Sequence, residues 1–62
     1  MNQYRVKVTK GKTVGYVVDR NTIQYNMRQT KTTLHRFGIA YELAAYYRDL
    51  GWSTLVIPFN IL

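Results

Sequence analysis

The chain has 62 residues, a length that permits one small domain spanning residues 1–62. It carries nine Lys and Arg residues against three Asp and Glu residues, for a formal net charge of +6, and it has no cysteine. Disulfides and thiolate metal sites are therefore excluded. A single His cannot build an imidazole site, so we expect neither a metal nor another cofactor.

No stretch of the sequence is apolar enough to predict a membrane segment. The longest uninterrupted apolar run is Leu55–Phe59, far below the roughly 20 residues that cross a bilayer. The first basic residues are not followed by an apolar block, so no signal peptide is indicated. We expect a cytoplasmic protein that does not associate with membranes.

Strict alternation of apolar and polar residues predicts three consecutive strands in the first half of the chain. The predicted strands are Gln3–Thr9, Thr13–Asp19 and Thr22–Arg28. The side chains expected to face the core are Tyr4, Val6, Val8, Val14, Tyr16, Val18, Ile23, Tyr25 and Met27. Turns around Gly11 and Asn21 would join these strands into an antiparallel meander with one apolar face and one solvent-facing face.

Between Ile39 and Leu50 the apolar residues recur with a helical period, and Gly51 is placed to end the predicted helix. The predicted apolar face comprises Phe37, Ile39, Ala40, Tyr41, Leu43, Ala44, Tyr46, Tyr47 and Leu50. The preceding segment, Thr32–Phe37, fits either a short strand or the first turns of the helix.

Residues Ser53–Phe59 alternate again and predict a last strand. Pro58 cannot donate to a sheet ladder, which indicates an edge position or the end of the strand. The expected fold class is α+β: a small antiparallel meander of three to four strands, then one helix packed on one sheet face, then a C-terminal strand.

The charge is concentrated in the first part of the chain. Residues 1–36 hold eight cations against Asp19 alone, a balance of +7, and residues 37–62 hold one cation against two acids, a balance of −1. This asymmetry favours a polyanionic partner. We expect the polar face and turns of the meander to bind nucleic acid, with DNA favoured over RNA. The candidate binding residues are Arg5, Lys7, Lys10, Lys12, Arg20, Gln24, Asn26, Arg28 and Lys31.

The expected binding mode is contact with the nucleic-acid backbone and groove. A ribbon of two or three strands fits the width of the DNA major groove. Tyr4, Tyr16 and Tyr25 share the apolar register, so base stacking on the polar face is not expected.

Two other classes of function stay open, whereas catalysis is not expected. His35 is the only imidazole and Ser53 the only serine, so the groups that acid–base or nucleophilic catalysis needs are nearly absent. The first alternative is a small protein-interaction module or inhibitor, of viral or mobile-element origin, that binds an acidic partner surface. The second is a homodimer formed through the apolar C-terminal segment Leu55–Leu62.

Overall fold

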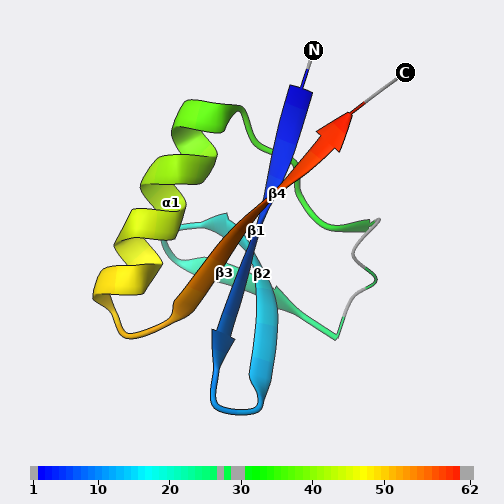
Figure 1. The fold of residues 1–62 in the computed structure, drawn as a ribbon. Coiled ribbons are helices and arrows are strands. Elements are labelled where there is room, and N and C mark those ends of the chain that lie inside the picture. Colours follow the sequence, from blue (N-terminus) through cyan, green and yellow to red (C-terminus); the bar gives the residue numbers. More distant parts are fainter. Residues whose placement is uncertain (1, 27, 29–30, 61–62) are drawn as a thin grey trace.

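A computed structural model describes residues 2–26, 28 and 31–60 of the chain. Within this part, antiparallel strands form one sheet and one helix covers one of its faces (Figure 1). The elements are β1 (Asn2–Lys10), β2 (Thr13–Asp19), β3 (Thr22–Tyr25), α1 (Phe37–Asp49) and β4 (Ser53–Asn60). The strand order β3-β2-β1-β4 places β4 at an edge of the sheet, beside the N-terminal strand. The predicted α+β class, the meander and the edge position indicated by Pro58 are confirmed.

The strand pairing follows from the turns and from the length of β4. Lys10 pairs with Thr13, which leaves Gly11 and Lys12 as a two-residue hairpin loop, and Gly11 takes the positive φ (59°) that such a loop requires. Strand β4 pairs with β1 along its whole length without a register shift. Strand β3 is shorter than predicted because Asn26 adopts a left-handed φ of 57° immediately after it. Met27 lies outside the described residues.

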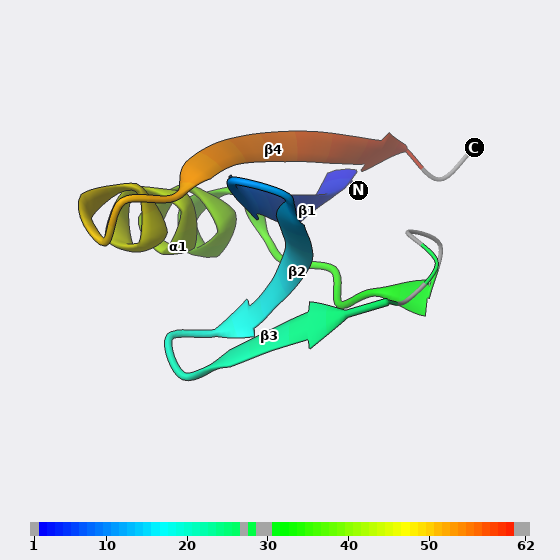
Figure 2. The ribbon, with the colours of Figure 1, turned by 90° about the horizontal axis from the view of Figure 1, so that it is seen from below.

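Strand β2 departs from β1 after Tyr16, and the sheet curls as a result (Figure 2). Beyond that point His35 takes the place beside β1, where it exchanges backbone hydrogen bonds of 2.8 and 2.7 Å with Tyr4. The segment Thr32–Phe37 is therefore neither a regular strand nor the start of the helix, apart from Phe37 itself, the first residue of α1. A backbone bridge at His35 pairs it with Tyr4 of β1.

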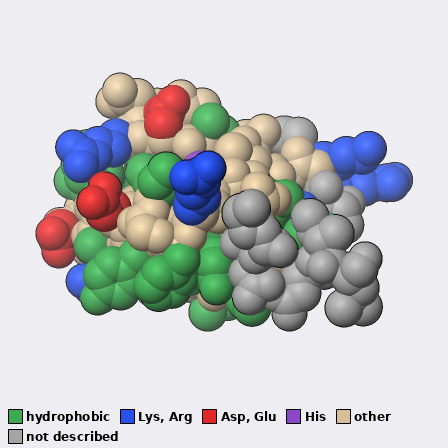
Figure 3. All heavy atoms as spheres, turned by 90° about the horizontal axis from the view of Figure 1, so that it is seen from above, with side chains coloured by type: hydrophobic (Ala, Val, Ile, Leu, Met, Phe, Trp, Pro, Cys, Tyr) green, Lys and Arg blue, Asp and Glu red, His purple; other side chains and the backbone are tan. Residues whose placement is uncertain are grey.

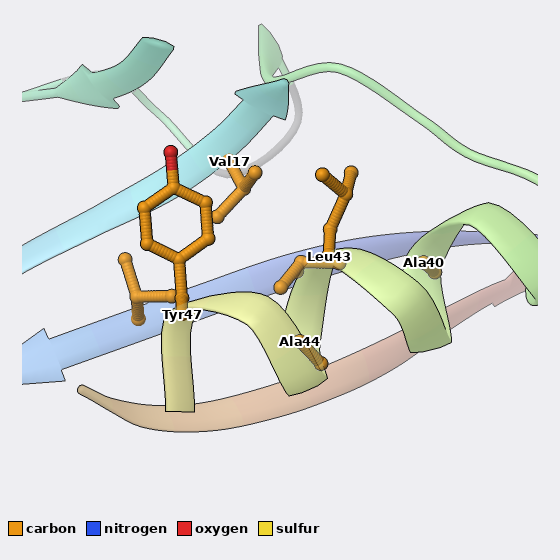
Figure 4. Packing of buried hydrophobic residues seen from close by; sticks show 7 residues of the cluster. Val17, Ala40, Leu43, Ala44 and Tyr47 are labelled. Carbon is orange, nitrogen blue, oxygen red and sulfur yellow. The ribbon is translucent and has the colours of Figure 1, made fainter. Parts of the chain in front are cut away.

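The core lies between α1 and the sheet. It consists of the buried residues Val6, Val8, Val17, Ala40, Leu43, Ala44 and Tyr47. Figure 4 shows Leu43 and Tyr47 extending from α1 toward Val17. The small side chains of Ala40 and Ala44 let the helix lie close to β1 and β4, the strands against which it packs.

Helix α1 ends as predicted at Gly51, whose φ is 97°. The Gly51 N–H donates to the Arg48 carbonyl and the Trp52 N–H donates to the Tyr47 carbonyl, the two bonds of a Schellman motif. The Tyr47 and Trp52 rings pack edge to face at 6.5 Å and close the motif. Arg48 lies in the last turn, where the helix dipole favours a cation.

The buried face of α1 is narrower than predicted. Only Ala40, Leu43, Ala44 and Tyr47 are buried, because the helix rests mainly on the two strands β1 and β4 and its flanks extend beyond them. The predicted core positions that are instead exposed are Phe37, Ile39, Tyr41 and Leu50.

The predicted core side of β2 is wrong. Gly15 and Val17 are buried, Val14 is 41% exposed, and Tyr16 is half-buried on the opposite face. The cause is the register: Gly15 lies opposite Val8, and residues directly opposite each other in an antiparallel pair share a face. On β3, Ile23 packs against the core as predicted, whereas Tyr25 is exposed.

Candidate nucleic-acid interface

The sheet has a second face, opposite α1, which we call the open face. Cross-strand pairing places Gln24, Tyr16, Lys7 and Leu55 in one row across β3, β2, β1 and β4. The open face comprises Gln3, Arg5, Lys7, Thr9, Val14, Tyr16, Gln24, Ser53, Leu55, Ile57 and Phe59. None of these residues is acidic, so the face combines cations with aromatic, aliphatic and amide groups.

Arg5 lies on this face but is not exposed to solvent, contrary to the prediction. It is only 5% exposed. Its Nε donates a 3.0 Å hydrogen bond to Thr32 Oγ1, and its guanidinium lies 5.0 Å from the centre of the Phe59 ring. A cation is tolerated in such a place because hydrogen bonds and an aromatic face replace its water. Arg5 therefore holds the segment before α1 against the sheet.

A second contact also ties this segment to the open face. The Thr33 N–H donates to Gln24 Oε1 at 3.1 Å, and the Thr33 hydroxyl donates to the same oxygen at 3.4 Å. The half-buried amide of Gln24 is thus engaged within the chain. In the row that contains Gln24, Lys7 and Tyr16 are half-buried, and Leu55 is 58% exposed.

Two of the predicted binding residues contact the helix side of the molecule instead. Lys10 Nζ donates to the Leu50 carbonyl at 3.3 Å and lies 4.9 Å from the centre of the Trp52 ring. The Arg20 guanidinium lies 5.5 Å from the centre of the Tyr46 ring. Both cations stay exposed, but their contacts are with residues of α1 or those just after it. They are not part of the open face.

The remaining candidates lie in the segments that join the strands and the helix. Lys12 is exposed in the β1–β2 loop, at one end of the sheet. Arg28 and Lys31 are exposed and precede Thr32, and the Lys31 N–H donates to the Arg28 carbonyl at 2.9 Å. Asn26 is exposed at the end of β3. Figure 3 shows acidic side chains toward the α1 side of the molecule, whereas Lys and Arg side chains also project at the opposite end.

The structure adds to the site residues that the sequence prediction missed. Tyr16, Val14 and Leu55 border Lys7 or its neighbour Thr9 by direct cross-strand pairing. For Val14 and Tyr16, the signal that could have found them is Gly15. Its missing side chain leaves room for Ile23 and Tyr25 on the helix face, and this fixes the neighbouring Val14 and Tyr16 on the other face.

The described residues form no pocket and hold no cluster of three His, Cys, Asp or Glu residues arranged to bind a metal ion. No helix in this part of the chain is both long and apolar enough to cross a membrane. No known protein family, no curated protein and no solved structure matches the chain significantly.

Proposed function

We propose that the chain binds single-stranded nucleic acid on the open face. The observation that carries this proposal is the row in which Lys7 lies between Tyr16 and Leu55, on a face without a carboxylate. Lys12, Arg28 and Lys31 are exposed in the segments that join the strands and the helix, and they add positive charge outside that face. A cytoplasmic location, expected from the sequence, forms part of the proposal.

Each group has a separate role in the proposed contact. Lysine and arginine side chains neutralise phosphates without reading sequence, and this is the role proposed for Lys7, Lys12, Arg28 and Lys31. Tyr16 offers a ring on which one base can stack, a contact that every base can make. Leu55 and Val14 extend the apolar surface beside it. The expected binding is therefore salt-dependent and only weakly selective for sequence.

The width of the sheet favours a single strand over insertion into duplex DNA. Four strands spaced about 4.8 Å apart place the outer strands roughly 14 Å from each other, and the B-DNA major groove is about 12 Å wide. The segment that carries Thr32 and Thr33 lies over part of the open face and thickens it further. An exposed sheet surface with an aromatic ring is instead a platform for unpaired bases.

The test is a binding titration with a short fluorescent DNA strand, repeated with RNA and with duplex DNA, at several salt concentrations. Lys7→Glu is the test variant and Arg20→Glu the matched control. Both change the net charge by the same amount, but Arg20 contacts the helix side. We expect Lys7→Glu to weaken single-strand binding roughly tenfold more than Arg20→Glu does, because it removes a phosphate contact and repels the next phosphate. Arg5→Glu is unsuitable because Arg5 is buried.

Two results would contradict the proposal. One is the absence of binding to any of the three nucleic acids at low salt. The other is an equal loss of affinity in both variants, which would show that net charge alone attracts the strand and that the open face has no special part in binding.

A protein partner is the second candidate function, and the exposure of Leu55 and Val14 favours it. Apolar side chains beside a cation suit an extended, acidic peptide with apolar residues as well as a nucleic acid. Such a complex would survive nuclease treatment. Its affinity would fall on Leu55→Ser more than on removal of Lys12, the reverse of the order expected for a nucleic acid.

A further inference from the structure

The outer edge of β4 has backbone groups that no other strand of the described sheet pairs. Tyr4 exchanges its backbone hydrogen bonds with His35, so its amide and carbonyl point away from β4. Its cross-strand partner Pro58 must then also point its backbone outward, since groups in such a pair face away from each other. By the same alternation, the N–H and carbonyl groups of Thr54 and Val56 lie on the outer edge.

Exposed apolar side chains flank this edge on both faces of the sheet. On the open face, Leu55 is 58% exposed and Phe59 is 36% exposed. On the helix face, Phe37 packs 5.3 Å from Tyr4, the cross-strand neighbour of Pro58. Tyr41 adds a second ring 6.1 Å from Phe37, and each of the two is more than half exposed. Figure 3 shows hydrophobic side chains gathered on the side of the molecule where α1 and β4 lie.

Pro58 removes one outward N–H from β4, but the part of the strand before it has little of the usual protection of an edge strand. Edge strands are normally short, irregular or charged, because an open edge can pair with another chain. Strand β4 has eight residues, none charged, and its pairing with β1 is regular. The opposite edge, β3, has only four residues and is followed by the left-handed Asn26. A strand that carries no charge can meet its own copy without repulsion, although the whole chain carries +6.

We infer that β4 pairs with β4 of a second copy in antiparallel orientation. The register follows from Pro58, which has no N–H to donate. Thr54 pairs with Val56 of the partner subunit, and Val56 pairs with Thr54 of the partner subunit. These two pairs form four backbone hydrogen bonds, none of which needs an N–H from Pro58. Leu55 then lies opposite its own copy on the two-fold axis, so the two side chains cover part of each other's exposed apolar surface. The two open faces form one continuous sheet surface. This inference stands independently of nucleic-acid binding.

The test is light scattering and sedimentation of the full chain over a range of concentrations. The monomer has a mass of 7.3 kDa, and we expect twice that mass at high concentration. Leu55→Lys should raise the concentration needed for dimerisation roughly 10- to 100-fold, because it removes an apolar contact and places like charges on the axis. The control is Val14→Lys, an equivalent change at an exposed site on β2, which should leave that concentration nearly unchanged.

Amide hydrogen exchange provides a second readout that requires no variant. The outward amides of Thr54 and Val56 should exchange rapidly in the dilute monomer and become protected in the concentrated sample. A chain that stays at 7.3 kDa at all concentrations would overturn the inference. So would dimers in which these two amides exchange as fast as in the monomer, or dimers that Leu55→Lys and Val14→Lys weaken equally.

Discussion

Two side chains complete the hydrogen bonding of β2 where that strand leaves β1. His35 Nε2 donates to the Val17 carbonyl at 2.8 Å, and the Tyr47 hydroxyl donates to the Asp19 carbonyl at 2.8 Å. A carbonyl can only accept, so Nε2 of His35 carries a proton. Without these donors, two carbonyls would lie at an interior edge of the sheet with no strand beside them, which costs free energy wherever water is excluded. The curl of the sheet therefore depends on His35 and Tyr47.

The contribution of Tyr47 can be measured with Tyr47→Phe. This change keeps the buried ring and removes only the hydroxyl that binds the Asp19 carbonyl. We expect the free energy of unfolding to fall by about 1–2 kcal/mol, the cost of leaving a carbonyl without its donor. Urea unfolding followed by circular dichroism measures this difference. A variant as stable as the parent protein would show that the bond contributes nothing.

The same hydroxyl predicts a loss of stability in alkali. Burial raises the pKa of Tyr47 above its ordinary value, and the neighbouring Tyr46 and Asp19 raise it further. The unfolded chain therefore ionises this tyrosine near pH 10, before the folded chain does. Its stabilising contribution is complete below about pH 10 and falls as the pH rises above that value. The difference in stability between the parent and Tyr47→Phe should therefore shrink as the pH rises above about 10; a constant difference would contradict the assignment.

At the scale of the elements, the sequence of β2 does not decide which face of that strand is buried. Val14, Tyr16 and Val18 are apolar on one face, and Val17 is apolar on the other. The register with β1 puts Gly15 under the side chains of β3. A Cβ on Gly15 would overlap Cγ2 of Ile23, so the absence of a side chain is required there. The close packing of β3 on β2 thus decides which face of β2 is buried.

Alanine substitutions at two glycines test this account. We expect Gly15→Ala to lower the free energy of unfolding by about 1–3 kcal/mol, because the added methyl group displaces Ile23. Gly38, near the start of α1, has open space where a Cβ would be. Gly38→Ala should therefore raise stability by up to about 1 kcal/mol. Thermal unfolding of both variants provides the comparison, and a Gly15→Ala protein as stable as Gly38→Ala would show that the space over Gly15 is not filled.

The helix and the strands were predicted well from the sequence. The contacts that bury part of the open face were not predicted. Strand alternation and the Gly51 stop signal are local patterns, and they located the strands, the helix and its C-terminal cap to within a few residues. The burial of Arg5 depends on Thr32 and Phe59, which are distant in sequence, and no local pattern encodes such a contact. Lys7 was predicted on the polar face, but its neighbours Tyr16 and Leu55 were not. Gly15 indicates the phase of β2 and so the face of Tyr16, whereas the place of Leu55 beside Lys7 follows from the long-range pairing of β4 with β1.

At the scale of the whole molecule, the positive charge is divided between two sides. Lys10 and Arg20 contact aromatic rings on the helix side, and Lys7 lies on the open face. The acidic residues Glu42 and Asp49 belong to α1. A polyanion therefore meets attraction alone on the open face, and mixed charges on the helix. This difference, more than the total of +6, determines where we expect a nucleic acid to bind.

An NMR titration of the isotope-labelled chain with a short DNA strand tests this location most directly. We expect the largest changes in amide chemical shift at Lys7, Tyr16 and Leu55, with Arg20 and the exposed face of α1 nearly unchanged. Raising the salt concentration should reverse these changes, because phosphate contacts release bound counterions. A spectrum that does not change on addition of the strand, or one whose changes are centred on α1, would contradict the proposal that the open face binds nucleic acid.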